Sequence, residues 1–405
     1  TPNLTSPLSS GSYLMENNFY ISIFGGEPGE VTGVTECTAP IPLHYTLEKC
    51  SDNTTGWITG QETTEITLSN NDRVSVGGEF YIVTGTSSTG TSVGTVSDTG
   101  QTGCPVVTNE FVTVWNSGSN GEIKLPLEAS GTYNFDVYWG DGNVDTITSY
   151  NQTEVRHYYL DRNTDHTVTI SGTIEGFSFV NEPLFRNQFK KVVSWGSLKL
   201  GNSGNYFAGN TSVTDFSEIS DTLDLTGTTN LAGMFKEIDD VGSINNIENW
   251  DVSNVTNMSE MFYGTNFNDD ISAWNVGSVT NMRQMFFAAN TFNQSIGTWD
   301  VSSVTDMNGM FYSASAFNQN LDLWDVSNVT DMGTMFRFAI NFNGDIYSWS
   351  VCSVSNMDSM FESAAQFNRD LSNWKVPLIP TEPFKFDYQA SNWILPRPGF
   401  GESCN

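Results

Sequence analysis

The chain has 405 residues and a net charge of −30, from 46 acidic and 16 basic side chains. An excess of negative charge on this scale is repelled by nucleic acid and by anionic lipid surfaces, which excludes both as partners. Aromatic residues make up 13% of the sequence, so the chain folds around a core, and no run of about 18 apolar residues predicts a membrane span.

Residues 1–105 are rich in Gly, Ser and Thr and contain short segments that alternate as β-strands do. Cys37, Cys50 and Cys104 fall in this region; a Cys37–Cys50 or Cys50–Cys104 disulfide and buried free thiols both fit their positions. The two cysteines at 37 and 50, with Arg73–Val76 and Phe80–Val83, resemble small β domains of marine phage structural proteins. The resemblance implies a β-rich anchoring or assembly domain that contacts other structural proteins.

Residues 106–180 contain strand-like segments at the short spacing of a small β-sandwich, including Phe111–Trp115, Tyr133–Trp139 and His166–Gly172. The turn W-G-D-G at Trp139–Gly142, followed by H-Y-Y from His157, resembles a PKD-like domain of the immunoglobulin type. That resemblance implies a spacer between the first domain and the rest of the chain.

A candidate calcium loop lies at the end of the W-G-D-G turn. Asp141, Asn143 and Asp145 have the D-x-N-x-D spacing of calcium loops, but the twelfth position is Gln152, which is a poor ligand. The alternative is a structural turn in which Asp141 binds the backbone. Apart from this calcium, no cofactor is expected.

Residues 181–405 are predicted to be a repeat domain. A unit of 24 or 25 residues recurs from Trp250 to Trp374, with degraded copies before it. The segment around each tryptophan alternates like a strand. The next segment spaces Val279, Met282 and Met285 like one face of a helix, which Ser278 would cap. We therefore predict a multidomain chain: N-terminal all-β domains followed by an α/β leucine-rich-repeat-type solenoid with coils of about 25 residues.

The consensus W-D-V-S-x-V-T-x-M-x-x-M-F-x-x-A-x-x-F-N resembles the BspA-type leucine-rich repeat of surface proteins from bacteria, some protists and viruses. The resemblance covers residues 250–376 closely, and Trp393–Gly401 is similar to the segment that closes such arrays. It implies a role in recognition or adhesion at a surface.

Two sets of repeated residues are candidate ligand-binding sites on this domain. Strand alternation places one set, a polar ladder, opposite the buried Trp and Val side chains, and mutual repulsion is expected to raise the pKa of its carboxyls. A cation, a basic partner or neighbouring Ser hydroxyls would offset that repulsion. The second set is an aromatic row beside the helix stripe, for which packing between coils is the alternative. The polar ladder is Asp251, Asn275, Asp300 and Asp325, and the aromatic row is Tyr263, Phe287 and Tyr312.

The sequence carries no catalytic signature. It has three histidines and lacks G-x-S-x-G, H-E-x-x-H and phosphate-binding glycine motifs. We predict a non-enzymatic recognition or adhesion protein on the extracellular surface or on a virion, where it would be a fibre or decoration protein. Its expected partners are a cell-surface protein or glycan through the solenoid, structural proteins through the N-terminal region, and a second copy in a homo-oligomer. The alternatives are a bacterial adhesin, which is expected to carry a signal peptide and anchor, a structural scaffold, and a glycan-active enzyme.

Overall fold

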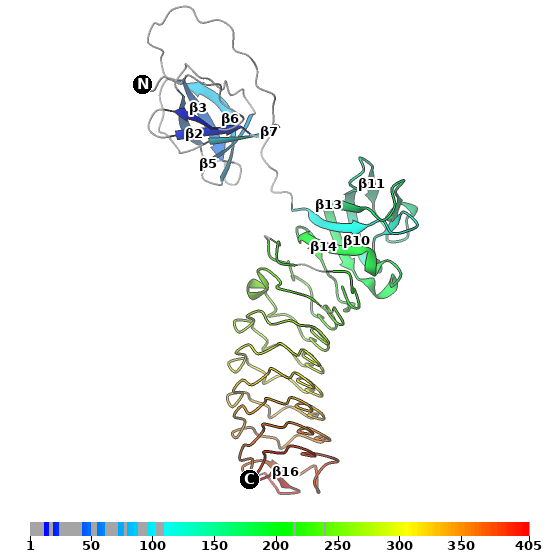
Figure 1. The fold of residues 1–405 in the computed structure, drawn as a ribbon, viewed down its shortest axis with the longest axis vertical. Coiled ribbons are helices and arrows are strands. Elements are labelled where there is room, and N and C mark those ends of the chain that lie inside the picture. Colours follow the sequence, from blue (N-terminus) through cyan, green and yellow to red (C-terminus); the bar gives the residue numbers. More distant parts are fainter. Residues whose placement is uncertain are drawn as a thin grey trace, which may run out of the picture. The chain divides into compact units, whose positions relative to one another are not determined.

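The structure is a computed structural model of the whole chain (Figure 1). It describes residues 109–404 except 214, 215, 220 and 239, together with the backbone of seven strands between residues 12 and 102. The chain divides into two compact units, Thr1–Thr108 and Asn109–Asn405. We call them the N-terminal and the C-terminal unit and describe each by itself.

The N-terminal unit contains a seven-stranded sheet of order β1-β2-β7-β5-β6-β3-β4. All neighbours are antiparallel except β2 and β7, which are parallel. The segments predicted as strands at Arg73–Val76 and Phe80–Val83 lie within β5 and β6, while Cys37, Cys50 and Cys104 lie outside the described residues. The strands are β1 (Ser12–Met15), β2 (Phe19–Ile23), β3 (Leu43–Lys49), β4 (Thr55–Gly60), β5 (Asp72–Val76), β6 (Glu79–Ser87) and β7 (Val96–Thr102).

The C-terminal unit begins with a sheet of order β11-β10-β13-β8-β14, with β15 added beside β13, and a separate ribbon of β9 and β12. In β8, Phe111 and Trp115 alternate inward and are fully buried, as the period of two predicts. The strands here are β8 (Phe111–Asn116), β9 (Glu122–Lys124), β10 (Leu127–Tyr138), β11 (Val144–Ile147), β12 (Arg156–Tyr158), β13 (Asp165–Phe177), β14 (Phe189–Ser194) and β15 (Leu198–Lys199).

The first sheet and the repeats share one core. Strands β14 and β15 follow residue 180 in the sequence, yet they pair with β8 and β13. The ring of Phe207 then lies 5.9 Å from Phe177 and 5.7 Å from Phe189, measured between centroids. No gap in apolar packing separates the sheet from the residues that follow it.

The prediction of an α/β solenoid is wrong, because the repeats contain no α-helix in the part of the chain that the structure describes. Among the described residues, the only helical segments are one-turn 3-10 helices, and none could span a membrane. Each repeat is a series of turns that bridges in parallel to the next at one position per repeat, from Asn230 to Asn356. The 3-10 helices are η2 (Thr153–Val155), η3 (Phe179–Asn181), η4 (Arg186–Gln188) and η5 (Ile247–Asn249).

Left-handed residues explain the absence of helix. Gln284 and Ala288 have φ of 54°, and the equivalent positions of the other repeats also have positive φ, which ends a helix within one turn. Alternate amides then bond to the next repeat: Met282 N–H donates to Asp306 O at 3.0 Å and Gln284 N–H to Asn308 O at 2.9 Å. The intervening amides close short turns, as Met285 N–H does to Met282 O.

The repeats stack side by side along the C-terminal unit, from green to red in Figure 1. The equivalent rings of Phe286 and Phe311 lie 5.7 Å apart and within 8° of parallel. The repeated methionines are fully buried beside them. Each tryptophan from Trp274 to Trp374 is buried and donates its indole N–H to a carbonyl of the preceding repeat, as Trp324 does to Ile296 O at 2.9 Å.

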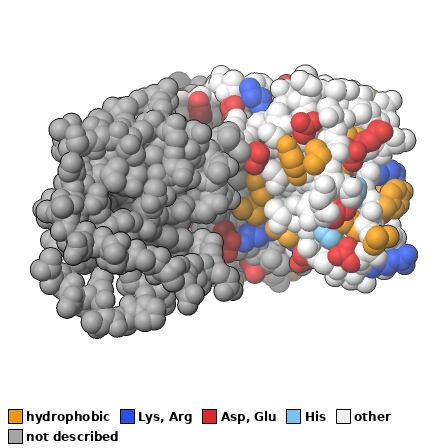
Figure 2. Space-filling model, turned by 90° about the horizontal axis from the view of Figure 1, so that it is seen from above, with side chains coloured by type: hydrophobic (Ala, Val, Ile, Leu, Met, Phe, Trp, Pro, Cys, Tyr) orange, Lys and Arg blue, Asp and Glu red, His pale blue; other side chains and the backbone are white. Residues whose placement is uncertain are grey.

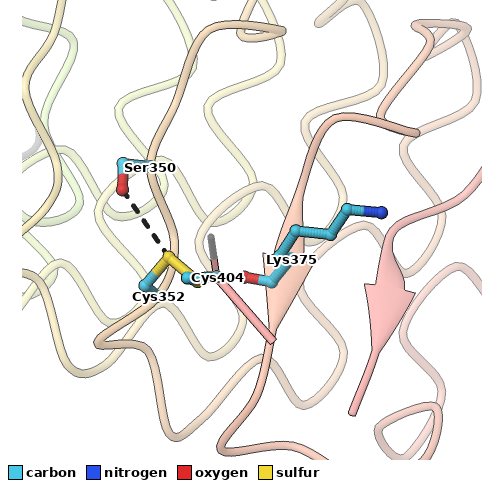
Figure 3. Close-up of a disulfide and its surroundings, with 4 residues drawn as sticks. All are labelled: Ser350, Cys352, Lys375 and Cys404. Carbon is cyan, nitrogen blue, oxygen red and sulfur yellow. Dashed lines mark hydrogen bonds between the residues drawn. A yellow bond between two sulfur atoms is a disulfide. The ribbon is translucent and has the colours of Figure 1, made fainter. Parts of the chain in front are cut away.

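The last repeat is covered by the C-terminal residues. Trp393 packs edge-on against Phe361 and Phe367, and β16 (Lys375–Val376) pairs in parallel with β17 (Gly399–Phe400). Figure 3 shows the Cys352–Cys404 disulfide, which links the fifth repeat to this covering segment. The end of the stack is therefore closed by packing and by a covalent bond.

Candidate recognition surface

The predicted polar ladder lies at equivalent exposed positions of four consecutive repeats. Asp251, Asn275, Asp300 and Asp325 are all exposed, while the neighbouring Trp and Val side chains are buried. In each case the side-chain oxygen accepts a hydrogen bond from the backbone N–H two residues later, at 3.0–3.2 Å. The ladder therefore also fixes the turn that follows each tryptophan.

The expected rise in carboxyl pKa is wrong for Asp251 and Asp300. Hydrogen bonds from the Ser253 hydroxyl and backbone lower the pKa of Asp251, and those from Ser302 lower the pKa of Asp300. Repulsion between repeats is weaker than these local donors. The carboxylates of Asp251 and Asp300 are therefore held in their charged form by donors of their own repeats.

A row of exposed hydroxyl residues, five positions after each member of the ladder, was not predicted. Thr280, Thr305 and Thr330 are exposed, and each donates both its backbone N–H and its hydroxyl to the carbonyl of the equivalent threonine in the preceding repeat. The threonine or serine that follows Val in every repeat was the available signal. We call the ladder and this row together the polar face.

The ring faces of the aromatic row are covered by neighbouring side chains. Tyr263 and Phe287 stack at 4.4 Å between centroids and 3°, and Phe287 and Tyr312 at 4.3 Å and 9°. Lys236 lies over the outer face of Tyr263 at 4.9 Å, and Arg337 lies 5.5 Å from the ring of Tyr312. The three rings are half-buried and present edges to solvent, so the row offers little open ring face for stacking of a sugar.

A row of asparagines, one directly after the last phenylalanine of each repeat, links the loops of consecutive repeats. The backbone N–H of Asn293 donates to the side-chain oxygen of Asn268 at 2.9 Å, and the same bond recurs from Asn318 to Asn293 and from Asn343 to Asn318. Asn268, Asn293 and Asn318 are exposed, so the row lies at the surface. Its side-chain oxygens accept hydrogen bonds from backbone N–H groups of these loops.

The candidate calcium residues bind other groups of the protein. Asp141 accepts from the Asn143 backbone at 3.0 Å and is 2.8 Å from His157 Nε2, while Asp145 accepts from the Trp139 indole at 2.9 Å. Burial favours the neutral form of Asp141, but the bonds from His157 and Asn143 outweigh it and lower its pKa to about 2. Within residues 109–404, as far as they are described, no group of three or more His, Cys, Asp or Glu side chains is placed to hold a metal ion.

Some of the exposed apolar side chains lie at the end of the C-terminal unit that carries the first sheet, and others lie on the later repeats and the covering segment. Figure 2 looks onto this end and shows apolar side chains between acidic ones. Tyr158 and Leu160 are among the most exposed large apolar residues described. Single exposed apolar residues are common on protein surfaces, so this patch does not by itself mark a site.

Comparison with known proteins gives one similarity. The profile of a family described as "Mycoplasma protein of unknown function, DUF285" matches residues 229–336 and 288–391, which are the repeats and the start of the covering segment. No curated protein and no solved structure matches the chain. The similarity is to a repeat of this kind, and its description states no activity, ligand or location.

Proposed function

We propose that the chain is a non-enzymatic recognition protein that binds a cell-surface protein or glycan through the polar face of its repeats. The observation that carries this proposal is the repetition of exposed carboxylates and hydroxyls on consecutive repeats. A stacked set of repeats holds such groups at a fixed spacing, and many weak contacts at fixed spacing add up on an extended partner.

The charge of the face favours a basic partner. The three aspartates of the ladder are exposed, and the lowered pKa values of Asp251 and Asp300 keep those two carboxyls ionised at neutral pH. Complementary charge speeds encounter and selects among partners. The aromatic row, whose ring faces are covered within the molecule, is the weaker candidate for the contact.

An extracellular or virion surface is the location that we propose. The disulfide between Cys352 and Cys404 supports it, because disulfides persist in oxidising compartments. In this proposal the N-terminal unit attaches the chain to other structural proteins, and the repeats contact the cell.

The test removes charge from the ladder without removing its turns. In the variant Asp251→Asn/Asp300→Asn/Asp325→Asn each side chain keeps the oxygen that accepts from the backbone, as the natural Asn275 does. Binding to cells, measured by flow cytometry with labelled protein, is expected to fall at least about tenfold if each of the three contacts is worth about 0.5 kcal/mol or more.

The control is Asp270→Asn/Asp345→Asn/Asp370→Asn. It also removes three negative charges, at turns outside the polar face where each aspartate accepts from the backbone N–H two residues later. This variant is expected to bind as the parent does. Equal binding by all three proteins would mean that the polar face is only solvated and that the repeats act as a scaffold.

A further inference from the structure

A pocket lies where the first sheet meets the first repeats. It has a volume of about 210 Å³ and is lined by segments 179–186, 205–209 and 236–237. Its walls combine apolar atoms of Phe179, Val180 and Pro183 with the cationic side chains of Arg186 and Lys236. The volume is below the roughly 300–1,000 Å³ of pockets for drug-sized molecules, so only a small ligand or one group of a larger ligand fits.

Among the described residues, no carboxylate forms an ion pair with the Arg186 guanidinium in this pocket. Its Nε atom is buried and lacks a hydrogen-bond partner among the described residues. Arg156, Arg337 and Arg397, by contrast, each pair with a carboxylate. A half-buried guanidinium without an acceptor loses part of its hydration and makes no hydrogen bond in exchange. An anion that enters the pocket would offset this unfavourable desolvation free energy.

The backbone beside Arg186 is shaped to admit the guanidinium. Gly209 has φ of +67°, and a Cβ built on it would lie 2.4 Å from Arg186 Nη1. Only glycine avoids both the strained dihedral and the collision. The second cation, Lys236, pairs with Glu260, whereas Arg186 Nε has no partner among the residues that the structure describes.

We propose that this pocket binds a single oxyanion group, a carboxylate or a sulfate, of a small ligand such as an acidic sugar. Arg186 offers a planar set of donors that matches such a group, and Lys236 adds positive charge. Glu237 lies on the lining and is exposed, so it opposes the anion and limits affinity. The inference does not depend on the proposed role of the polar face.

The test is calorimetric titration of the whole chain with sodium glucuronate and with sodium sulfate, at constant ionic strength set with chloride. Glucose is the neutral control. The parent is expected to bind at least one of the two anions and not glucose, and a preference between them identifies the source of the oxyanion. Arg186→Gln is expected to weaken binding at least about tenfold.

Two further variants keep the test decisive. Arg369→Gln removes a guanidinium that donates to Asn343 O outside the pocket and is expected to bind as the parent does. Glu237→Gln is expected to tighten binding and to increase the rise in Tm that the anion causes, even if Arg186→Gln does not fold. Absence of binding by the parent, or equal weakening in Arg186→Gln and Arg369→Gln, would overturn the proposal.

Discussion

Each repeated tryptophan fills the core and satisfies a carbonyl of its neighbour. Trp324 is 2% exposed and donates to Ile296 O, whereas the adjacent Leu323 is 79% exposed. We expect Trp324→Ala to lower the free energy of unfolding by about 3–5 kcal/mol, because it leaves a cavity and an unpaired carbonyl. Leu323→Ala is expected to change it by less than about 0.5 kcal/mol. Urea unfolding followed by circular dichroism measures both, and similar losses would contradict the assignment.

The pair of Asp141 and His157 makes stability depend on pH in acid. The pKa of Asp141 is lowered from 3.8 to about 2, so its contribution is present above about pH 4 and is lost as the pH falls through 2. We expect the parent to lose about 1–2 kcal/mol more than Asp141→Asn across this range, which is less than the full pKa shift implies because solvent screens this exposed carboxylate. The free energy of unfolding measured at a series of pH values tests this, and parallel acid limbs for the two proteins would refute it.

From the sequence, the burial or exposure of the repeated residues could be predicted better than the pKa values of their side chains. The period alone identifies the buried Trp, Met and Phe and the exposed Asp251 and Asp300, because a fixed repeat aligns equivalent positions. The direction of the carboxyl pKa could not be obtained in this way. It depends on which serine donor folds back onto each carboxylate, and such short-range geometry has no periodic signal.

At the scale of the element, a stripe of apolar residues proved ambiguous. Val279, Met282 and Met285 follow the i, i+3 spacing of a helix, but two consecutive turns that close after three residues give the same spacing. The residues that end each turn are Gln284 and Ala288 in this repeat, neither of which signals positive φ. The tertiary bonds between repeats enforce a conformation that local propensity does not favour.

Each repeat has two positions with positive φ, and the first of them predicts opposite effects of two substitutions. Gly309 has φ of +63°, and a Cβ there would lie 3.1 Å from Gln284 Cγ. Gly309→Ala is therefore expected to lower the free energy of unfolding by about 1–2 kcal/mol. Gln284→Gly, at the equivalent position of the preceding repeat, is expected to be neutral or stabilising by up to about 1 kcal/mol. Denaturant titration compares the two, and the reverse order would show that backbone strain is not the cause.

At the scale of the whole C-terminal unit, the sheet and the repeats form one folded body. The sequence places a boundary at residue 180, because the strand pattern stops there and the repeats begin. The pairing of β14 with β8 and of β15 with β13 crosses this position. Long-range pairing of single strands leaves no periodic trace, and neither does the link from Cys352 to Cys404, so neither could be predicted.

This shared core predicts how fragments behave. A fragment of residues 109–405 is expected to unfold in a single cooperative transition. A fragment of residues 181–405 loses the partners of β14 and β15 and exposes Phe189 and Phe207, so its Tm is expected to be lower, with earlier exchange of the first repeats. Calorimetry and hydrogen exchange measure this. Equal Tm values for both fragments would show that the sheet contributes nothing to the stability of the repeats.

The backbone hydrogen bonds between repeats also allow the length of the stack to change. Since the amides of each repeat find their acceptors in the next one, a duplicated copy inserted between two repeats would meet the same donors and acceptors on both sides. Each in-frame duplication would move the two ends of the stack apart by one strand spacing, about 4.8 Å, without a new core to design. Unequal crossing-over between such copies would therefore change the length of the stack in fixed steps of one repeat.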